Sequence, residues 1–437
     1  MLKGKTVAPL TLGCKVNQYE TDGMIELLKE AGMTAVSFEE KADVYLINTC
    51  SVTNMADKKS RQMIHRAKKL NPDAVVIAAG CYVQAAKDKL MEDDRISIII
   101  GNNKKKDIVQ ILEDYLEIGV TDEGMLDIAA EKEYEPLTIN STLEHTRAYV
   151  KIQDGCNQFC SYCIIPYVRG RIRSRELASI TEEVERLAQT GVKEIVLTGI
   201  HISSYGKDKE NEVGLADVID AISKIESIER IRLGSLEPGI ITDTFIDRIV
   251  DNKKVCPHFH LSLQSGCNTV LKRMNRKYTC EEYFEKCEML RKAFDRPALT
   301  TDVIVGFPGE TDEEFQETVD YLTKLNLYEM HIFKFSPRQG TVAAGMRDQI
   351  GPEIKNQRSD VLLALSEKNK HAYEASFRGE ILEVLIEEKV RRNGKDGYRG
   401  HTERYIDIFV EEECMHRICG REVDIINHIV QIPYGME

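Results

Sequence analysis

The amino-acid sequence predicts an α/β protein made of three successive units. They are an N-terminal doubly wound parallel sheet (1–135), a central partial (β/α)6 barrel (145–375) and a C-terminal small antiparallel β-barrel (376–437). Two observations predict the first two units. Short apolar runs alternate with helical runs in the N-terminal part, and they do so again at larger spacings in the central part, as is typical of parallel sheets covered by helices. A third observation is the change to short β-rich runs after the last long helix. With 437 residues, each unit can bury its own core.

The N-terminal unit is predicted from its buried strands and the helices between them. A helix is expected over 17–33, where Asn17 and Glu20 resemble a capping box. A basic helix is expected from about 57 to 70, and an aperiodic stretch at 131–145 indicates a linker. The strand candidates are 6–12, 43–49, 74–80 and 96–101.

The central unit repeats the alternation with larger spacings. Six βα units are too few for a closed eightfold barrel, so they suit an open partial barrel or a second doubly wound sheet. A charged helix at about 353–376 leads to the C-terminal unit, whose β-rich runs are separated by turns. The strand candidates of the central unit are 148–153, 194–199, 230–235, 258–264, 299–306 and 329–335.

Composition excludes several classes of protein. The apolar runs are shorter than a membrane span, and the first residues lack the pattern of a secretory signal, so we expect a cytoplasmic protein without a membrane partner. A net charge of −13 argues against a general polyanion binder, although basic segments at 58–69 and 169–175 leave room for local RNA contacts. In a reducing compartment, the twelve cysteines need an explanation other than disulfides.

Three cysteines stand close together after the first strand candidate of the central unit. Cys156, Cys160 and Cys163 form a C-x3-C-x2-C pattern. A structural zinc site needs a fourth ligand nearby, and neither His145 nor His201 stands at zinc-finger spacing. Thiolates hold iron–sulfur clusters, and three of them leave one iron with an open position. The pattern favours such a cluster, with zinc or plain buried cysteines as alternatives.

A second set of three cysteines is spread over the N-terminal unit. Cys14, Cys50 and Cys81 each follow a predicted strand and precede a predicted helix. Carboxyl ends of parallel strands share one edge of a sheet, so we expect the three thiols to meet there. The dipole at a helix N-terminus also stabilises a thiolate. Three small buried hydrophobic residues are the alternative, but the shared position favours a second three-cysteine cluster.

The loop "CNQFCSYC", placed after the first of six βα units, resembles that of the radical S-adenosylmethionine (SAM) superfamily. The resemblance implies a [4Fe–4S] cluster that binds SAM and cleaves it to a 5′-deoxyadenosyl radical. The segments "LTG", "LQSG" and "VIVGFPGET" resemble the SAM-contacting segments of that superfamily. They imply cofactor-binding roles for Thr198, Gly199, Gln264 and Ser265, with an ordinary turn as the alternative for each segment.

Two three-cysteine sites in this order resemble the methylthiotransferases of that superfamily, over nearly the whole chain. Within the family, "LGCKVNQYE" resembles the MtaB type rather than the isopentenyladenosine-tRNA or ribosomal-protein types. The resemblance implies two [4Fe–4S] clusters, each used with SAM, and catalytic roles for all six cysteines. It implies methylthio insertion at carbon 2 of threonylcarbamoyladenosine, beside the anticodon of a tRNA. An electron donor and a sulfur source are implied as further partners.

The run "RGRIRSR" directly follows the central cysteine loop. In an extended segment its alternate residues would lie on one side, where guanidinium groups suit phosphate or carboxylate. We therefore expect an RNA-binding rim, with salt bridges to the many acidic residues as the alternative. The basic helix at 57–70 leaves phosphate contact and ordinary surface equally open. The four residues of the expected rim are Arg169, Arg171, Arg173 and Arg175.

The C-terminal unit resembles a TRAM domain, which in relatives holds the anticodon arm. "GHTERY" places His401 where the family often has arginine, which leaves the RNA contact in doubt. Arg391, Arg392 and Lys395 are a hypothesis for a substitute contact. Competing functions are methylthiotransfer to isopentenyladenosine tRNA or to a ribosomal protein, or RNA binding by an iron–sulfur protein without catalysis. SAM cleavage distinguishes the last of these from the others.

Overall fold

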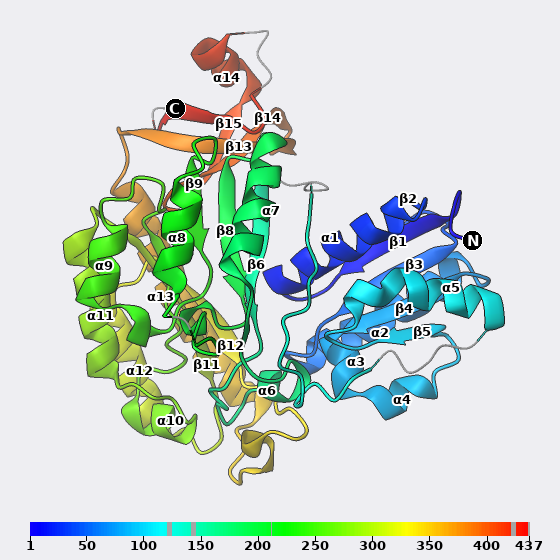
Figure 1. Cartoon of the computed structure of the whole chain (residues 1–437). Helices are drawn as coiled ribbons and strands as arrows, with labels where there is room; N and C mark the ends of the chain where they lie inside the picture. Colours follow the sequence, from blue (N-terminus) through cyan, green and yellow to red (C-terminus); the bar gives the residue numbers. More distant parts are fainter. Residues whose placement is uncertain (120–124, 141–145, 211, 421–424, 436–437) are drawn as a thin grey trace.

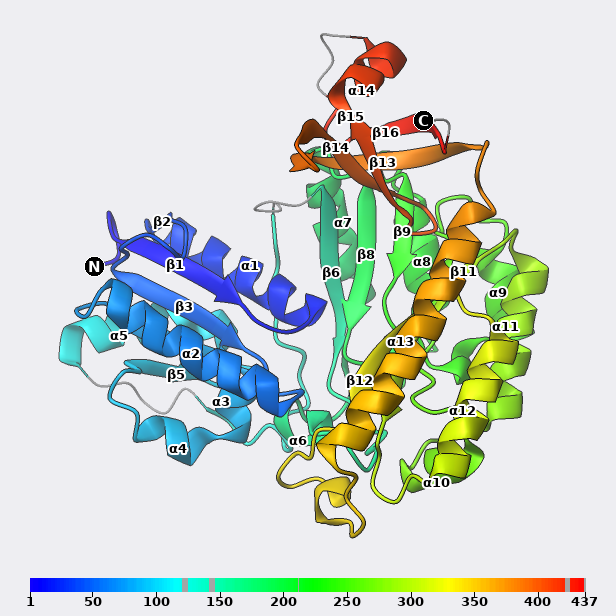
Figure 2. The same cartoon turned by 180° about the vertical axis from the view of Figure 1, so that it is seen from behind.

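The computed structural model describes residues 1–119, 125–140, 146–210, 212–420 and 425–435. Figures 1 and 2 show a parallel sheet beside a partial barrel, with a small antiparallel sheet over one end of the barrel strands. The predicted fold class is confirmed. Within these residues, none of the helices combines the length and the apolar character that crossing a bilayer requires.

The N-terminal unit is a five-stranded parallel sheet in the order β2-β1-β3-β4-β5. Met24 and Leu28 of α1 and Leu112 of α5 cover one face, whereas Ile64 and Ala67 of α2 cover the other. Apolar side chains on both faces explain the near-continuous apolar strands. The elements are β1 Thr6–Thr11, α1 Lys15–Glu30, β2 Thr34–Ala35, β3 Val44–Thr49, α2 Asn54–Leu70, β4 Val75–Gly80, α3 Cys81–Ala85, α4 Lys87–Met91, β5 Ile98–Ile100 and α5 Ile108–Ile118.

Helix α1 differs from its prediction at its first turn. It begins two residues before Asn17, with Cys14 at the N-cap position, so the expected capping box with Glu20 is wrong. The amide nitrogen of Asn17 instead donates to the carbonyl oxygens of Leu12 and Thr49, at 2.7 and 3.0 Å. Glu20 is buried among basic side chains. Contacts between distant segments therefore override the local capping pattern.

The central unit has six parallel strands, as the partial barrel requires. Ladders join β6, β8 and β9 and, separately, β10, β11 and β12. Parallel bridges from Ile231 to Val255 and from Leu236 to Leu261 connect these two groups. No ladder joins β12 to β6 in the part of the chain that the structure describes, so the barrel is open there. The start of α1 lies beside β6 in both views (Figures 1 and 2).

The outer face of the barrel strands packs against helices, whereas the inner face is largely polar. Val150, Leu197 and Leu299 lie in the outer core with residues of the surrounding helices. The elements are β6 Arg147–Asp154, α6 Ile165–Val168, β7 Arg173–Ser174, α7 Leu177–Gln189, β8 Glu194–Gly199, α8 Leu215–Ser223, β9 Arg230–Leu233, α9 Asp243–Ile249, β10 His258–His260, α10 Asn268–Arg273, α11 Cys280–Ala293, β11 Ala298–Val305, α12 Asp312–Leu325, β12 Glu329–Lys334 and α13 Pro352–Ala375.

The described part of the expected linker runs along the barrel. Leu137 and Ile139 are buried in the barrel core, and the carbonyl oxygen of Leu137 accepts a hydrogen bond from Tyr19 of α1. These contacts hold the two units together. Residues 141–145 of the same expected linker lie outside the described residues.

The C-terminal unit is an antiparallel sheet in the order β15-β14-β13-β16, which lies over the amino ends of the barrel strands (Figure 1). Two arginines of β9 bind its backbone. Arg230 donates to the carbonyl oxygens of His401 and Glu383, and Arg232 donates to those of Thr402 and Glu403, at 2.8 to 3.2 Å. The elements are β13 Ile381–Arg392, β14 Lys395–Thr402, β15 Asp407–Glu411, α14 Glu412–Cys419 and β16 Ile429–Pro433.

Candidate active site with two cysteine triplets

Cys14, Cys50 and Cys81, the N-terminal triplet, lie just after β1, β3 and β4. These strands are neighbours in the sheet, so the three thiols share its carboxyl edge, as predicted. Burial raises the pKa of the Cys50 thiol to about 11, and the charges of Cys81 and Cys14 add to that rise. The three thiols are therefore close enough to act on one another.

A glycine allows two loops of the N-terminal triplet to approach. Gly13 has a φ of +104°, and a Cβ atom there would lie 2.8 Å from the Cβ and Sγ atoms of Cys50. Only glycine adopts this conformation freely and leaves that space open. The amide of Asn17 ties the same two loops together through its bonds to Leu12 and Thr49.

Cys156, Cys160 and Cys163, the barrel triplet, lie on the loop after β6. Cys156 N–H donates to Gly170 O at 3.0 Å, and Cys163 N–H donates to Cys160 O at 2.9 Å. Burial, followed by the charge of Cys160, raises the pKa of Cys163 to about 12. The loop thus places three buried or partly buried cysteines at the carboxyl end of β6.

Arg276 was not found by sequence reasoning, yet it contacts the barrel triplet directly. Its Nη1 lies 3.2 Å from the Sγ of Cys160, and its Nη2 lies 2.6 Å from Glu237 Oε1. Arg276 is nearly buried, with 6% of its side chain exposed. It stands 116 residues from Cys160 along the chain, so no local spacing could reveal the contact.

The expectation of an RNA-binding rim is wrong for three of its four arginines, because their side chains are buried. Three of its four arginines have at most 3% of their surface exposed, and each is close to an acidic residue of the protein. Arg175 binds Glu183, and Arg173 lies 3.8 Å from Asp154. The salt-bridge alternative therefore holds for Arg169, Arg173 and Arg175. Arg171 alone is exposed, with its guanidinium 4.4 Å from the ring centroid of Phe159.

Arg169 connects the two triplets. Its Nε–H donates to Cys81 Sγ at 3.2 Å, and Nη2 donates to Asn17 Oδ1 at 2.7 Å. Nη1 donates to Glu20 at 2.8 Å and to Asp154 at 3.2 Å. Asp154 ends β6, two residues before the first cysteine of the barrel triplet. The loops of both triplets are therefore anchored on one guanidinium.

The acidic partners of Arg169 belong to a larger buried ion-pair cluster. Lys105 and Lys151 lie 2.6 and 2.7 Å from the carboxylate of Glu20. Although burial opposes ionisation, the charges of Arg169, Lys105 and Lys151 hold the pKa of Glu20 well below its usual range. The carboxylate is thus ionised and fixes all three cations between the first two units.

The four residues predicted to bind SAM lie at the same end of the barrel as its triplet. Thr198 and Gly199 end β8, and Gln264 and Ser265 follow β10. Gln264 has a left-handed φ of +79° and pairs with Val303 through a parallel bridge. These positions suit contact with a ligand on the barrel triplet, and that contact stays a prediction.

A cavity of about 530 Å³ opens beside the barrel triplet. Its wall includes Gln158 of the cysteine loop, together with His201 and Glu237 at the ends of neighbouring strands. Gln158 Nε2 donates to Glu237 at 3.2 Å, and His201 Nε2 lies 3.6 Å from the same carboxylate. The cavity therefore reaches the cysteine loop at Gln158, where its wall is polar.

Both triplets fit an iron–sulfur cluster better than a single zinc ion. Among the described residues, neither triplet has its three sulfur atoms within 4.8 Å of one another, whereas zinc, with bonds of about 2.3 Å to each thiolate, needs them closer. Guanidinium N–H groups point at Cys81 and Cys160, as suits thiolate ligands. Three thiolates match a [4Fe–4S] cluster with one open iron.

Two family models match the chain. The model of the radical SAM superfamily matches residues 150–322, which include the barrel triplet, and that of the uncharacterized protein family UPF0004 matches residues 6–101, which include the N-terminal triplet. A solved structure of the radical SAM methyltransferase TsrM from Kitasatospora setae superposes with a TM-score of 0.57. It covers 78% of this chain and 77% of that one at 15% identity, which shows a shared fold alone.

Curated relatives match nearly the full length. The threonylcarbamoyladenosine tRNA methylthiotransferase MtaB of Bacillus subtilis is 42% identical over 98% of this chain and 93% of its own. The enzyme of the same name from Aquifex aeolicus is 40% identical over 92% and 96%. The tRNA-2-methylthio-N(6)-dimethylallyladenosine synthase of Thermoanaerobacter pseudethanolicus is 36% identical over 94% and 89%.

Proposed function

Because the chain belongs to the radical SAM methylthiotransferases that modify tRNA, we propose that it inserts a methylthio group at carbon 2 of threonylcarbamoyladenosine, beside the anticodon. The observation that carries the proposal is the pair of cysteine triplets, one on each of two sheet edges, joined by Arg169. Its support for this acceptor is the 42% identity to an enzyme named for that base.

The barrel triplet would hold the [4Fe–4S] cluster, and Thr198, Gly199, Gln264 and Ser265 would contact SAM. When bound, the cluster and SAM supply one-electron chemistry that activates a C–H bond. The chain orients the sulfur ligands through Arg276 and the backbone bonds of the cysteine loop. Cys160 is buried, and Cys156 and Cys163 are partly buried.

The N-terminal triplet would hold a second [4Fe–4S] cluster, which supplies the sulfur for transfer. Arg169 would orient Cys81 through its Nε–H, and Asn17 would keep the loops of Cys14 and Cys50 together. Neither cluster suffices for methylthiotransfer alone, because one serves hydrogen removal and the other serves sulfur delivery. A sulfur source and an electron donor are therefore further partners in this proposal.

The tRNA would be held by exposed basic residues around the first two units and by the C-terminal sheet. Arg171 and the basic side chains of α2, such as Lys58 and Lys59, are exposed. On the C-terminal sheet Arg391 and Arg392 are also exposed, whereas His401 is buried and stacks on Tyr405 at 4.6 Å. His401 thus has a structural contact at the position where relatives often carry arginine. We expect the reaction to take place in the cytoplasm, where tRNA is modified.

The test is product analysis with a defined RNA. Anaerobically reconstituted protein, SAM, a reductant and a sulfide source are incubated with an anticodon stem-loop that carries threonylcarbamoyladenosine, and the nucleosides are analysed by mass spectrometry. We expect the methylthio derivative from the wild type and none from a Cys14/Cys50/Cys81→Ala variant. Product only from a dimethylallyladenosine stem-loop would replace the proposed acceptor.

Iron analysis of the same two proteins tests the two clusters separately from the acceptor. We expect about eight irons in the wild type and about four in the triple variant. A wild type with four irons or fewer, and no loss in the variant, would show that the N-terminal triplet holds no cluster.

A further inference from the structure

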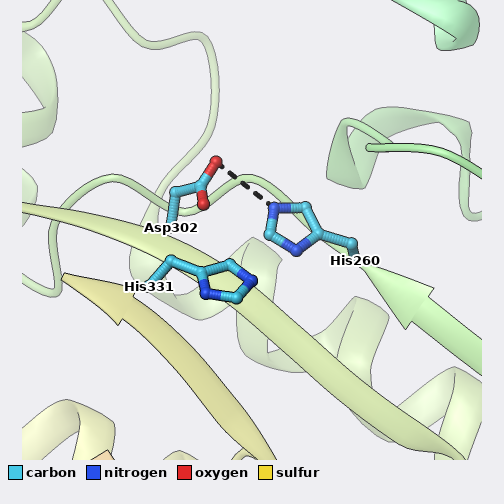
Figure 3. A group of neighbouring side chains, drawn as sticks. All are labelled: His260, Asp302 and His331. Atoms are coloured by element: carbon cyan, nitrogen blue, oxygen red, sulfur yellow. Dashed lines mark ion pairs between the residues drawn. The ribbon is translucent and has the colours of Figure 1, made fainter. Parts of the chain in front are cut away.

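A cluster of three polar side chains lies on the inner face of β10, β11 and β12 (Figure 3). His260 Nε2 lies 3.3 Å from Asp302 Oδ2, and the rings of His260 and His331 stack with centroids 5.7 Å apart. His260 Nδ1 faces the hydroxyl of Thr300 at 3.0 Å. In the described part of the chain, the ring nitrogens of His331 have no hydrogen-bond partner.

The fold itself does not require these polar groups. Neighbouring residues on the same strands, such as Leu261 and Val303, face outward and form the core with the helices. Polar side chains inside a barrel carry a desolvation cost, which is offset only by partners or by a ligand. His331 is exposed to the inner space, so the cluster is open to a ligand from that side.

Lys15 faces the same space from the N-terminal unit. It is the first residue of α1 and directly follows Cys14. Helix α1 packs against β6 and β8, and its start lies beside β6 (Figures 1 and 2). The influence of the charges of Lys15, His260 and His331 on the buried imidazole of His258 agrees with a common location. The lysine and the histidine cluster are therefore walls of one inner chamber, hereafter the barrel chamber.

Lys15 lacks a direct ionic partner in the part of the chamber that the structure describes. Arg232 pairs with Glu194 at 2.7 Å and Arg147 with Glu387 at 3.2 Å, and both guanidinium groups lie over the ring of Tyr405. The ammonium of Lys15 has no ion pair or hydrogen bond within the described residues, although it lies near both arginines. A ligand with an anionic oxygen would give this ammonium a direct partner.

We propose that Lys15 and the His260–Asp302–His331 cluster recognise the polar substituent of the target adenine. Lys15 binds the carboxylate of the substituent, and the cluster exchanges hydrogen bonds with its hydroxyl and carbamoyl groups. This inference rests on the proposed function, because threonylcarbamoyl is a substituent with those three groups. A base held at Lys15 lies beside Cys14, where sulfur would be delivered.

One ligand atom of each side chain in the cluster lies within 4.8 Å of the other two, so a metal ion is the competing ligand, and the orientation of the rings argues against it. Imidazole binds a metal through a ring nitrogen and in the plane of the ring, so two histidine ligands of one ion point their edges toward it. The rings of His260 and His331 are instead stacked, with an angle of only 22° between their planes. Stacked rings present a flat surface with hydrogen-bonding edges, which suits a polar, planar group such as the carbamoyl.

The test compares three anticodon stem-loops that differ only at the base beside the anticodon. They carry threonylcarbamoyladenosine, its neutral methyl ester, or dimethylallyladenosine. Binding is measured by fluorescence anisotropy with reconstituted full-length protein and no reductant, so that no turnover occurs. We expect the wild type to bind the carboxylate RNA about tenfold more tightly than the ester, as one charge-assisted hydrogen bond gives.

His331→Phe is expected to weaken the binding of the carboxylate and ester RNAs alike, because both keep the hydroxyl and carbamoyl groups, and to leave the binding of the dimethylallyl RNA unchanged. Lys15→Met is expected to lose most of the preference for the carboxylate RNA while it binds the ester RNA as the wild type does. Lys15→Arg should retain it, and Lys41→Met and His371→Phe, at exposed positions elsewhere, should have no effect. Wild-type preference in Lys15→Met, or wild-type affinity of His331→Phe for the carboxylate and ester RNAs, would overturn the inference, as would a zinc ion per protein that His331→Phe removes. A wild type that modifies only the dimethylallyl RNA would overturn the proposed function instead.

Discussion

Arg169 donates its Nε–H to the sulfur of Cys81 across 3.2 Å, although the two residues belong to different units of the fold. The same guanidinium binds Asp154 at the end of β6, next to the loop of the barrel triplet. One buried side chain thus contacts the N-terminal triplet and the strand end that leads into the loop of the barrel triplet. Loss of the Arg169 side chain should therefore disturb the loops of both triplets.

Replacing Arg169 by Gln should destabilise the protein by about 3–5 kcal/mol, because Glu20 and Asp154 would remain buried without a cation that they now share. Urea unfolding measures this free energy, and iron analysis measures the accompanying loss of cluster. Arg171→Gln, at the exposed position two residues on, should change the stability by no more than about 0.5 kcal/mol. Equal stability of the two variants would contradict the structure.

Gly13→Ala should remove the iron of the N-terminal triplet. The added Cβ would lie 2.8 Å from Cys50 Cβ and Sγ, so that loop must shift. Gly4→Ala is the matched control, because Gly4 also has a positive φ of +84° but nothing lies within 4 Å of the new Cβ. About half of the iron should be lost in the first variant and none in the second. Full iron content in Gly13→Ala would be the contrary result.

Arg276→Gln should slow SAM cleavage about tenfold or more, as is usual when a partner of a metal ligand is removed. The variant leaves Cys160 without its guanidinium donor and Glu237 without the Arg276 ion pair. Formation of 5′-deoxyadenosine without RNA measures the effect, and the electron paramagnetic resonance spectrum of the reduced barrel cluster should change as well. Arg291→Gln, on the outer surface, should leave both unchanged.

His258 should make stability depend on pH. Burial, followed by the charges of Arg232, Lys15, His260 and His331, holds its pKa well below the usual value, so it stays neutral in the folded protein. The unfolded chain binds a proton there below about pH 6.5. Stability is therefore lost as the pH falls through that value, by up to about 1.4 kcal/mol per pH unit.

His258→Phe should flatten this dependence while the new ring keeps the stacking on Tyr405, now 5.2 Å from His258. The measurement is urea unfolding at pH 7.5, 6.5 and 5.5 for the wild type and the variant. His371→Phe, at an exposed position, is the control and should keep the wild-type slope. An unchanged slope in His258→Phe would show that this imidazole is protonated in the folded state.

Arg171→Ala should weaken tRNA binding and reduce its salt dependence. Loss of one phosphate contact lowers the slope of log K against log salt by about 0.7 to 0.9. The measurement is filter binding between 50 and 200 mM salt, with Lys41→Ala as control for an exposed cation elsewhere. An unchanged slope would place the phosphate contacts at other residues.

The sequence predicts the cysteine positions well because strand ends can be located from local patterns. Cys14, Cys50 and Cys81 follow recognisable buried strands, and the topology of a parallel sheet brings such positions together. Local patterns fail where distant segments decide a side chain's role. Asn17 and Glu20 have the spacing of a capping box, yet their partners come from other parts of the chain.

The arginine run shows the same limit. Its alternation predicts one exposed face, but the acids that bury Arg169 and Arg175 lie on α1 and α7. Arg276 and the His260–Asp302–His331 cluster have no sequence signal, because Arg276 stands 116 residues from Cys160 and Asp302 stands 42 residues from His260, on a separate strand. These contacts are seen only in the three-dimensional structure. The amount of a protein's chemistry that its sequence discloses thus depends on how local the contacts are.

Arg230 and Arg232 bind the backbone of residues 383 and 401–403 through hydrogen bonds. The C-terminal sheet therefore closes the amino end of the barrel. Tyr405 of the same unit is stacked on His258, so a segment of the C-terminal unit also shapes the interior. The C-terminal sheet, which is proposed to bind tRNA, is therefore structurally coupled to the barrel and is not an independent domain. Deletion of residues 376–437 should therefore disturb the interior of the barrel as well as the proposed tRNA contact of this sheet.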